Sequence, residues 1–302
     1  MAAHDRTTLF ALLATHPNTA ALKTGKVRSD LVDFKFADVK VSNTEFKPLV
    51  REHKYDMAEL ATVTYLQAFE KGDSYVLLPA TVVGRNQHHT IFYNADRGAL
   101  TARDLTGKRV GVRAYTQTTG AWVRGFLAED YGVETEHVRW VTFEDAHVAR
   151  YRDPEFVERA PQGKAIKQML LDGELDAAIL GDYQEEGPLK HLISDHEQAG
   201  RNWAKRHGGV PINHLVVIRE SIAEEKPEVV RDVYRLLKES RAAASAIYDS
   251  GEGDPLRFGV SNIRQSFETL VGYALKQKLI TERVSAGEVF ERAISILGSA
   301  AE

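Results

Sequence analysis

The side chains that follow three predicted strands could bind an anion. Strands predicted at 9–14, 57–61 and 109–114 each run into a segment rich in hydroxyl and amide groups, where a helix is expected to begin. Helix N-termini carry unbonded N–H groups, and ligands of open α/β sheets lie beyond the carboxyl ends of the strands. Each segment alone would serve equally well as an ordinary helix cap, whereas the three together would suit a carboxylate. The candidate binding residues in these segments are His16, Thr64, Tyr65, Tyr115, Gln117, Thr118 and Thr119.

Proton transfer is the second chemistry that the sequence offers, because histidine titrates near neutral pH. His88 and His89 follow Arg85, and they could form a carboxylate clamp with a titratable acid or occupy a surface or hinge position. His214 precedes an apolar run and is either a second general acid or a core histidine. Glu59 interrupts an otherwise apolar strand near its carboxyl end. We expect it to be either a charge at the edge of a lobe or a cleft carboxylate with a raised pKa.

Other kinds of chemistry find less support in the sequence. His147 lies three residues after Glu144, but this spacing fixes no set of three ligands, so no metal is expected. The chain has no cysteine, which excludes thiol nucleophiles and thiolate metal sites. It has no glycine-rich phosphate-binding motif, and its net charge of −4 offers no basic field to nucleic acid. Trp122 could stack on an aromatic ligand or pack in the core.

An alternation of strands and helices must position these residues. Apolar strand candidates alternate with segments of helical period, which is typical of an α/β fold with parallel sheets. Helices are predicted from Thr44, from Thr118 or Thr119 to a glycine cap at Gly132, and at 165–172. The last third is predicted to be helical, at 227–250, from Ser261 and at 286–297, with a loop at 249–255. The strands are predicted at 9–14, 31–37, 57–61, 75–83, 89–94, 109–114, 138–143, 175–180 and 214–219.

The N-terminal region bears on location. Its apolar run, at 9–14, is shorter than the roughly 7–15 residues of a secretory signal, and we expect an internal first strand. A removed export signal is the alternative. No apolar run approaches the roughly 20 residues of a membrane span, so we expect a soluble, cytoplasmic protein. A length of 302 residues allows one large domain or two ordinary ones.

The segment around the third of these strands resembles a known family. Residues 108–127 read KRVGVRAYTQTTGAWVRGFL, and the run ends at Tyr131-Gly-Val. This segment resembles the 4,5-dihydroxyphthalate decarboxylase family, and shorter matches follow in order along nearly the whole chain. They are DMAEL at 56–60, Arg85 with His89, GELDAAI at 173–179, PINH at 211–214, and Asp254-Pro, Phe258-Gly and Asn262.

The resemblance implies a fold like that of type 2 periplasmic binding proteins. This is an α/β architecture of two lobes with a ligand cleft between them and, in this chain, a helical C-terminal region. Lobe I would comprise residues 1–94 and 214–302, and lobe II residues 95–213. The middle of the chain, which the strand and helix pattern already marks as self-contained, would form the second lobe.

The resemblance also implies a cofactor-independent decarboxylase of a hydroxylated aromatic carboxylate. Its expected ligand is a small aromatic carboxylate; no nucleic acid or membrane partner is expected, and the oligomeric state is open. The carboxylates would be bound by Arg85, Thr118 and Thr119. The general acid would be His89 or His214, with Glu59 orienting a phenol or accepting its proton.

Departures from the family pattern leave the substrate open. His88 stands where the family usually has arginine, residues 141–147 replace a glycine-rich turn, and residues 116–118 vary a turn near the ligand. The main alternative is a non-catalytic solute-binding protein of the same fold, for an aromatic or other small carboxylate. An enzyme of pyrimidine or quinone-precursor biosynthesis is a lesser alternative, because no matching motif is present.

Overall fold

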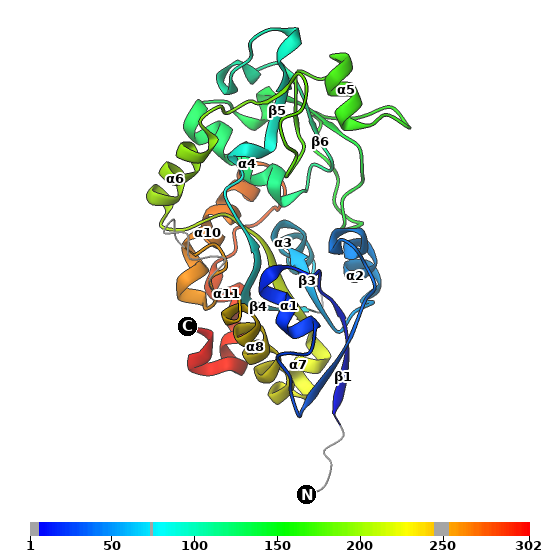
Figure 1. Cartoon of the computed structure of the whole chain (residues 1–302), viewed down its shortest axis with the longest axis vertical. Coiled ribbons are helices and arrows are strands. Elements are labelled where there is room, and N and C mark those ends of the chain that lie inside the picture. Colours follow the sequence, from blue (N-terminus) through cyan, green and yellow to red (C-terminus); the bar gives the residue numbers. More distant parts are fainter. Residues whose placement is uncertain (1–5, 73–74, 245–253) are drawn as a thin grey trace, which may run out of the picture. The chain divides into compact units, whose positions relative to one another are not determined.

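The computed structural model describes residues 6–72, 75–244 and 254–302 (Figure 1). Part of the predicted helix 227–250 and of the predicted loop 249–255 lies outside these residues. The chain divides into two compact units. The first comprises 1–85, 212–268 and 284–302, and the second comprises 86–211 and 269–283.

Two segments of predicted lobe I, 86–94 and 269–283, belong to the second unit, and residues 212–213 of predicted lobe II belong to the first. Residues 91–94 form strand β5 (Ile91–Asn94), which pairs with two strands of the second sheet. Residues 269–283 carry Gln277, whose side chain and carbonyl bond to Arg124 and Tyr115 of the second unit. The sequence-based boundaries assigned both segments to lobe I, because neither the pairing nor these bonds are visible in the local pattern.

The first unit is built on a five-stranded sheet of order β2-β1-β3-β11-β4. Its strands are β1 (Thr7–Leu12), β2 (Val32–Phe36), β3 (Met57–Ala61), β4 (Tyr75–Gly84) and β11 (Ile212–Arg219). Strand β1 runs parallel to β2 and β3, whereas β11 runs antiparallel to β3 and β4. The carboxyl ends of β1 and β3 therefore lie at the same edge of the sheet as the amino end of β11.

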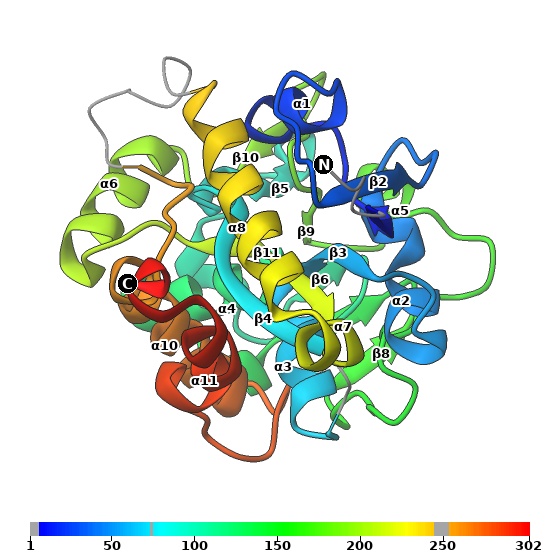
Figure 2. The same ribbon diagram turned by 90° about the horizontal axis from the view of Figure 1, so that it is seen from below.

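Helices cover both the ends and the faces of this sheet. They are α1 (Pro17–Lys23), α2 (Phe46–Glu52), α3 (Thr62–Phe69), α7 (Glu220–Glu225), α8 (Pro227–Ala242), α11 (Ala286–Leu297) and part of α10 (Val260–Lys276), with short 3-10 turns η1 (Ser42–Glu45) and η6 (Gly298–Ala301). In Figure 2, α8 crosses in front of β4 and β11.

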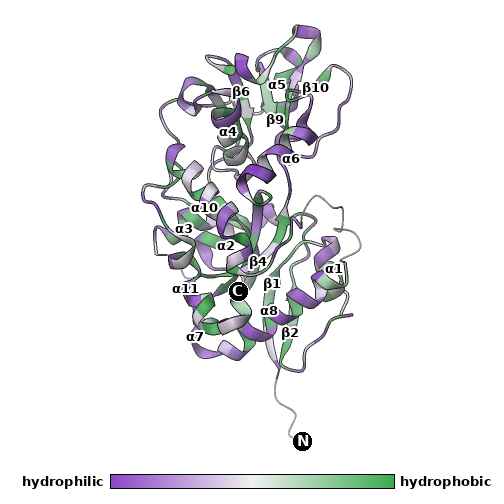
Figure 3. Cartoon of the chain, turned by 90° about the vertical axis from the view of Figure 1, so that its left-hand side faces the viewer, coloured by the Kyte–Doolittle hydropathy of each residue, from purple (hydrophilic) through white to green (hydrophobic). Residues whose placement is uncertain are grey.

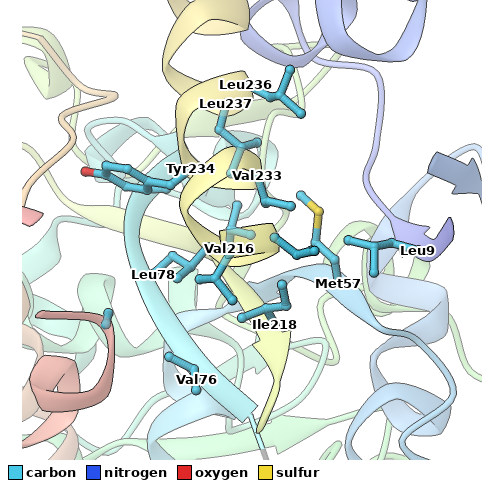
Figure 4. Close-up of a cluster of buried hydrophobic side chains, with 14 of the residues drawn as sticks. Leu9, Met57, Val76, Leu78, Val216, Ile218, Val233, Tyr234, Leu236 and Leu237 are labelled. Carbon is cyan, nitrogen blue, oxygen red and sulfur yellow. The ribbon is translucent and has the colours of Figure 1, made fainter. Parts of the chain in front are cut away.

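The main hydrophobic core of the first unit lies between α8 and the sheet. Val233, Leu236 and Leu237 recur at helical spacing and are buried against strand residues that include Met57 and Val216 (Figure 4). Burying these side chains removes apolar surface from water, worth about 25 cal/mol per Å². The face of β3 that carries Met57 is thus fixed against α8, and the next residue on that face is Glu59.

The second unit is built on a six-stranded sheet of order β10-β5-β9-β6-β7-β8. Its strands besides β5 are β6 (Arg109–Val112), β7 (Arg139–Thr142), β8 (Val157–Arg159), β9 (Ala177–Ile179) and β10 (Leu189–His191). Its helices are α4 (Thr118–Tyr131), α5 (Ile166–Asp172) and α6 (His196–His207), with 3-10 turns η2 (His88–Thr90), η3 (Ala95–Arg97), η4 (Ala102–Leu105) and η5 (Thr135–His137). Strands β6, β7, β8 and β9 are parallel.

Most predicted elements are present within two or three residues of their expected ends. The α4 helix starts at Thr118, one of its two predicted starts, and ends at a left-handed Gly132, and α11 spans 286–297 as predicted. The strand predicted at 89–94 starts late, because His88–Thr90 forms a 3-10 turn. Helices α6 and α7 and strands β8 and β10 were missed. Figure 3 shows α6 as mostly hydrophilic, and only Gly200 and Trp203 of it are buried, so it carries almost no apolar period.

No helix in the described part of the chain is long and apolar enough to cross a membrane.

Candidate functional site

Glu59 is a fully buried carboxylate at the centre of a polar cluster in the first unit. It lies in β3, directly opposite Val216 of β11 and on the same face as Met57, and none of its surface is exposed. An acidic side chain in this position must be paired, because an isolated buried charge is very costly. Its partners come from three other segments of the same unit: His16, His214 and Ser42.

His16 is the partner with the best geometry. It follows β1 and precedes Pro17, the first residue of α1, and its backbone N–H donates to Thr19 Oγ1 at 2.9 Å. Its Nε2 lies 2.9 Å from Glu59 Oε2, and 27% of its side chain is exposed. Because β1 and β3 are parallel neighbours, a residue just beyond β1 reaches a side chain near the carboxyl end of β3.

His214 approaches the other carboxylate oxygen. It pairs with Ala61 across the β3–β11 ladder and is therefore the diagonal neighbour of Glu59 on the same face. The register between β11 and β4 shifts on both sides of His214, an irregularity of the kind that re-aims a side chain. Its Nδ1 lies 3.4 Å from Glu59 Oε1, its ring meets Phe46 edge-on at 5.3 Å, and 19% of its side chain is exposed.

Ser42 completes the cluster, and sequence analysis missed it. Its hydroxyl donates to Glu59 Oε1, and the residue is buried. It lies in η1, immediately before α2. A serine at the start of a predicted helix is typical of a cap, so the sequence carried no separate signal for this contact.

The electrostatics of Glu59 differ from the prediction. Burial by itself raises the pKa of the Glu59 carboxyl, but the hydrogen bond from His16, the close approach of His214 and the positive charge of the two rings outweigh it, and the pKa is well below its usual value. The expected raised pKa is therefore wrong, because the sequence showed the burial but not the two imidazoles. Lys23, whose Nζ donates to Leu13 O at 2.6 Å, has a pKa lowered by burial and partly restored by the negative charges of Glu59 and Asp38.

His89 belongs to the second unit, whereas Glu59 and its partners belong to the first. Its Nε2 lies 3.2 Å from Asp182 Oδ1, and its ring is 6.0 Å from that of His196. Arg85 is half-buried and ends the first segment of the first unit. The structure thus unites His16, Glu59 and His214, and it places His89 with a different carboxylate.

His88 does not have the form of a cationic clamp. It is fully buried, and its ring stacks on Phe126 with centroids 4.0 Å apart and planes 6° apart. Burial lowers the pKa of His88 to about 3, aided by the positive charges of Arg206, His89 and His196. The imidazole is therefore neutral near pH 7, and neither ring nitrogen has a hydrogen-bond partner among the described residues.

Three aromatic candidates are buried. Tyr65 is buried, and its hydroxyl donates to Tyr75 O at 3.4 Å. Tyr115 is buried, donates to Gln277 O at 2.9 Å, and has a pKa raised to about 12, mainly by burial. Trp122 packs edge-on against Trp203 at 5.4 Å. Aromatic rings contribute large apolar areas, which is the reason that these positions hold them.

The remaining candidates lie at two helix starts. Thr64 is buried in the first turn of α3. Gln117 is the N-cap residue of α4, and the buried Thr118 and Thr119 are its first two residues. The predicted strand-to-helix junctions are confirmed at α1, α3 and α4, of which α4 belongs to the second unit. Within the described residues, no group of three or more histidine, aspartate or glutamate side chains is arranged to hold a metal, His147 included.

Two curated proteins are similar to this chain in sequence. It is 31% identical over 213 residues to the 4,5-dihydroxyphthalate decarboxylase of Comamonas testosteroni, a match that covers 64% of this chain and 63% of that protein. It is 35% identical over 167 residues to the 4,5-dihydroxyphthalate decarboxylase of Pseudomonas putida, which covers 51% and 64% respectively. The matches span slightly less than two thirds of the length of either relative. They confirm the predicted resemblance; no family model matches the chain.

Solved structures confirm the predicted fold. The periplasmic aliphatic sulphonate binding protein SsuA of Escherichia coli superposes with a TM-score of 0.61 at 10% identity, covering 95% of this chain and 92% of that one. The desulfurization enzyme DszB superposes with a TM-score of 0.54 at 14% identity, covering 97% and 99%. The chain therefore has the periplasmic-binding-protein fold, an architecture that is found in a solute-binding protein and in an enzyme.

Proposed function

We propose that this chain is a decarboxylase of a hydroxylated aromatic carboxylate, in which Glu59, His16 and His214 manage the protons. The observation that carries the proposal is one buried, ionised carboxylate flanked by two partly exposed imidazoles. The names of the two curated relatives favour decarboxylation over other proton-transfer reactions and suggest 4,5-dihydroxyphthalate as the substrate.

The geometry gives each imidazole a defined role. An ionised carboxylate only accepts hydrogen bonds, so the His16 nitrogen that faces Glu59, Nε2, carries a proton, and the proposal assigns proton exchange to Nδ1. His214 turns Nδ1 toward Glu59 and leaves Nε2. The proposal assigns the role of general acid to one ring in its protonated form and the role of general base to the other in its neutral form. The cluster then holds a general acid and a general base together.

The proposed reaction uses both groups. The neutral imidazole removes a proton from a ring hydroxyl ortho or para to the reacting carboxylate. The imidazolium adds a proton to the ring carbon that bears this carboxylate, which gives a dienone. The bond from that carbon to the carboxylate then breaks, its electron pair returns to the ring and its oxygen, and CO₂ leaves. The phenolate takes back the proton that the base holds, so the net change consumes one proton.

This route needs no cofactor, because the dienone carbonyl accepts the electron pair that decarboxylation releases. The protein's part is to position the ring, to supply the proton at carbon and to keep the charge of Glu59 close to the developing imidazolium. A buried acceptor is effective here, since electrostatic interactions are stronger away from water.

The test is to incubate the purified chain with 4,5-dihydroxyphthalate and to follow CO₂ and protocatechuate. We expect turnover by the wild type and at least a hundred-fold loss in the variant His214→Gln. His137→Gln is the matched control, because His137 is exposed and lies outside the cluster. Equal rates in the wild type, His214→Gln and a protein-free blank would refute the proposal.

The periplasmic-binding-protein fold supports one other function, a solute-binding protein for a small carboxylate. The same incubation separates the two, because tight binding of 4,5-dihydroxyphthalate without release of CO₂ favours the binding protein. Ligands that bind the folded state raise its melting temperature, so a thermal-shift series of phthalate, hydroxybenzoates and aliphatic dicarboxylates identifies the ligand in either case.

A further inference from the structure

Lys23 is a half-buried lysine that the proposed reaction does not use. It is the last residue of α1, and its Nζ donates to Leu13 O at 2.6 Å. The ammonium group also lies over the ring of Phe36, 5.4 Å from the centroid. A lysine side chain loses much conformational freedom when it is held in this way, so its fixed position calls for a physical reason.

Lys23 and Thr19 together hold the segment that carries His16. The two residues are four positions apart on α1 and therefore share one face of the helix. Thr19 Oγ1 donates to Ala14 O at 2.7 Å and accepts from the backbone N–H of His16 at 2.9 Å. Lys23 binds the carbonyl of the residue before, Leu13. Both side chains thus fix the path of the chain between the end of β1 and the imidazole.

Helix α1 is itself anchored to the first unit near both of its ends. Near its start, Asn18 Nδ2 donates to Val82 O of β4 at 3.3 Å. Near its end, the backbone N–H of Leu22 donates to the hydroxyl of Ser240 at 3.1 Å, and Ser240 is fully buried in α8. The side chain of Lys23 therefore starts from a fixed point and ends on a fixed carbonyl.

This arrangement brings the charge of Lys23 close to Glu59. Strands β1 and β3 are parallel and Leu12 pairs with Ala58, so Leu13 and Glu59 are the next residues along the two chains. Because Lys23 is bound to Leu13 O, its ammonium group lies at the strand ends where Glu59 is buried.

Lys23 acts on Glu59 without a direct bond. Within the described residues, the direct partners of the Glu59 carboxylate are His16, His214 and Ser42. The negative charges of Glu59 and of the exposed Asp38 favour the charged form of the Lys23 side chain. The other charged residues that border the same cavity as Lys23 are Arg6, Arg28 and Asp33.

We propose that Lys23 is a positioning residue for the proposed reaction, which orients His16 and compensates the charge of Glu59 when the general acid has given up its proton. The inference rests on the proposed function for the proton transfer itself. As that proton moves from the imidazolium to the ring carbon of the substrate, the buried carboxylate loses one positive partner. An ammonium group nearby lowers the free energy of this state. Without it, the imidazolium would hold its proton more tightly.

The experiment compares three variants of the full chain with the wild type. Lys23→Met removes both the charge and the bond to Leu13 O, whereas Lys23→Arg keeps a charge and a donor. Lys26→Met is the matched control, because Lys26 lies three residues further along, is exposed and carries the same charge. Circular dichroism and melting temperature establish that each variant is folded.

Two quantities are measured for each protein. The first is the pH profile of kcat and KM on 4,5-dihydroxyphthalate. The second, without substrate, is the NMR titration of the ring protons of His16 and His214, which are assigned with the variants His16→Gln and His214→Gln.

We expect the kcat of Lys23→Met to fall about ten-fold, with KM within about three-fold of the wild type. Loss of a positive charge stabilises both imidazolium forms, so both limbs of the pH profile should move to higher pH by about half a unit. The ring-proton titrations of His16 and His214 should move in the same direction. Lys23→Arg should keep about a third or more of the wild-type kcat, and Lys26→Met should change neither quantity.

The proposal is overturned if folded Lys23→Met keeps the wild-type kcat, or if its kcat falls while the pH profile and both ring titrations do not move. It is also overturned if Lys26→Met moves the profile as far, or if Lys23→Arg loses as much activity as Lys23→Met. A wild type that releases no CO₂ would refute the proposed function. The ring titrations then decide separately, since a shift in Lys23→Met supports the role assigned to Lys23 and an unchanged titration overturns it.

Discussion

Within the described residues, each unit buries one acidic or basic side chain completely, Glu59 in the first and Arg124 in the second, and the two charges are handled in opposite ways. In the first unit, Glu59 has polar partners from three segments, namely His16, Ser42 and His214. The two histidines can carry positive charge. In the second unit, Arg124 is held by carbonyl oxygens and aromatic faces alone among the described residues. A buried carboxylate with imidazole partners can take part in proton transfer. A buried guanidinium without a carboxylate partner instead adds a positive electrostatic potential to its surroundings.

Removing the charge of Glu59 should have the largest effect. Glu59→Gln keeps the shape of the side chain but no longer stabilises an imidazolium, so we expect a fall in kcat of at least a hundred-fold on 4,5-dihydroxyphthalate. Steady-state kinetics with CO₂ detection measures it, and His137→Gln serves as the unaffected control. A Glu59→Gln variant with kcat within three-fold of the wild type would show that the first unit does not use its buried charge in this way.

Removing one donor to Glu59 should have an intermediate effect. Ser42→Ala leaves both imidazoles in place and deletes a single hydrogen bond to Oε1, and hydrogen bonds to charged groups contribute about 1.5–3 kcal/mol. We expect kcat to fall about ten-fold with little change in KM, and Ser42→Thr to restore part of it. A change in KM alone would indicate that Ser42 affects substrate binding and not the carboxylate.

The pH dependence of the free energy of unfolding should also distinguish a variant at Glu59 from a variant at Arg124. The pKa of Glu59 is lower in the folded chain than its value of about 4.3 in an unfolded one. A depressed pKa contributes stability above the unfolded value, and this contribution is lost as the pH falls toward the folded pKa. The stability advantage of the wild type over Glu59→Gln should therefore shrink as the pH falls below about 4. Urea unfolding across this range measures it, and a difference independent of pH contradicts the account. An Arg124→Gln variant should show no such step, because arginine does not titrate there.

The smallest effect is expected at His88, a buried neutral group beside α4. Both of its ring nitrogens lack partners among the described residues, and its ring already stacks on Phe126. His88→Phe removes two unsatisfied polar atoms and keeps the stacking, so we expect a gain of about 1 kcal/mol, or roughly 2–4 °C in Tm. Calorimetry measures the shift. A loss of stability would mean that the imidazole is bonded in a way that the structure does not show.

Much of the fold was predictable because local signals agreed with it. The apolar periodicity and the capping residues placed most elements correctly. An example is α4, which begins at Thr118 and is capped by Gly132. The misses have physical reasons. Helix α6 carries only Gly200 and Trp203 as buried residues and so lacks an apolar period, and β8 and β10 are three-residue edge strands. The boundaries of the units were shifted by strand pairing of β5 and by the bonds of Gln277, which connect residues far apart in the sequence.

The sequence by itself determined the α/β class, the resemblance to the decarboxylases and the types of residue available for chemistry. Those properties follow from the apolar periodicity, the composition and the run of residues at 108–127. Only the tertiary structure decided which candidates meet. It joined His16, Glu59 and His214 because parallel β1 and β3 end at the edge where β11 begins, and it added Ser42, which no local signal marked. It also lowered the pKa of Glu59, for which a raised pKa was one of the two alternatives from sequence, since the sign of that shift depends on neighbours that only folding brings close.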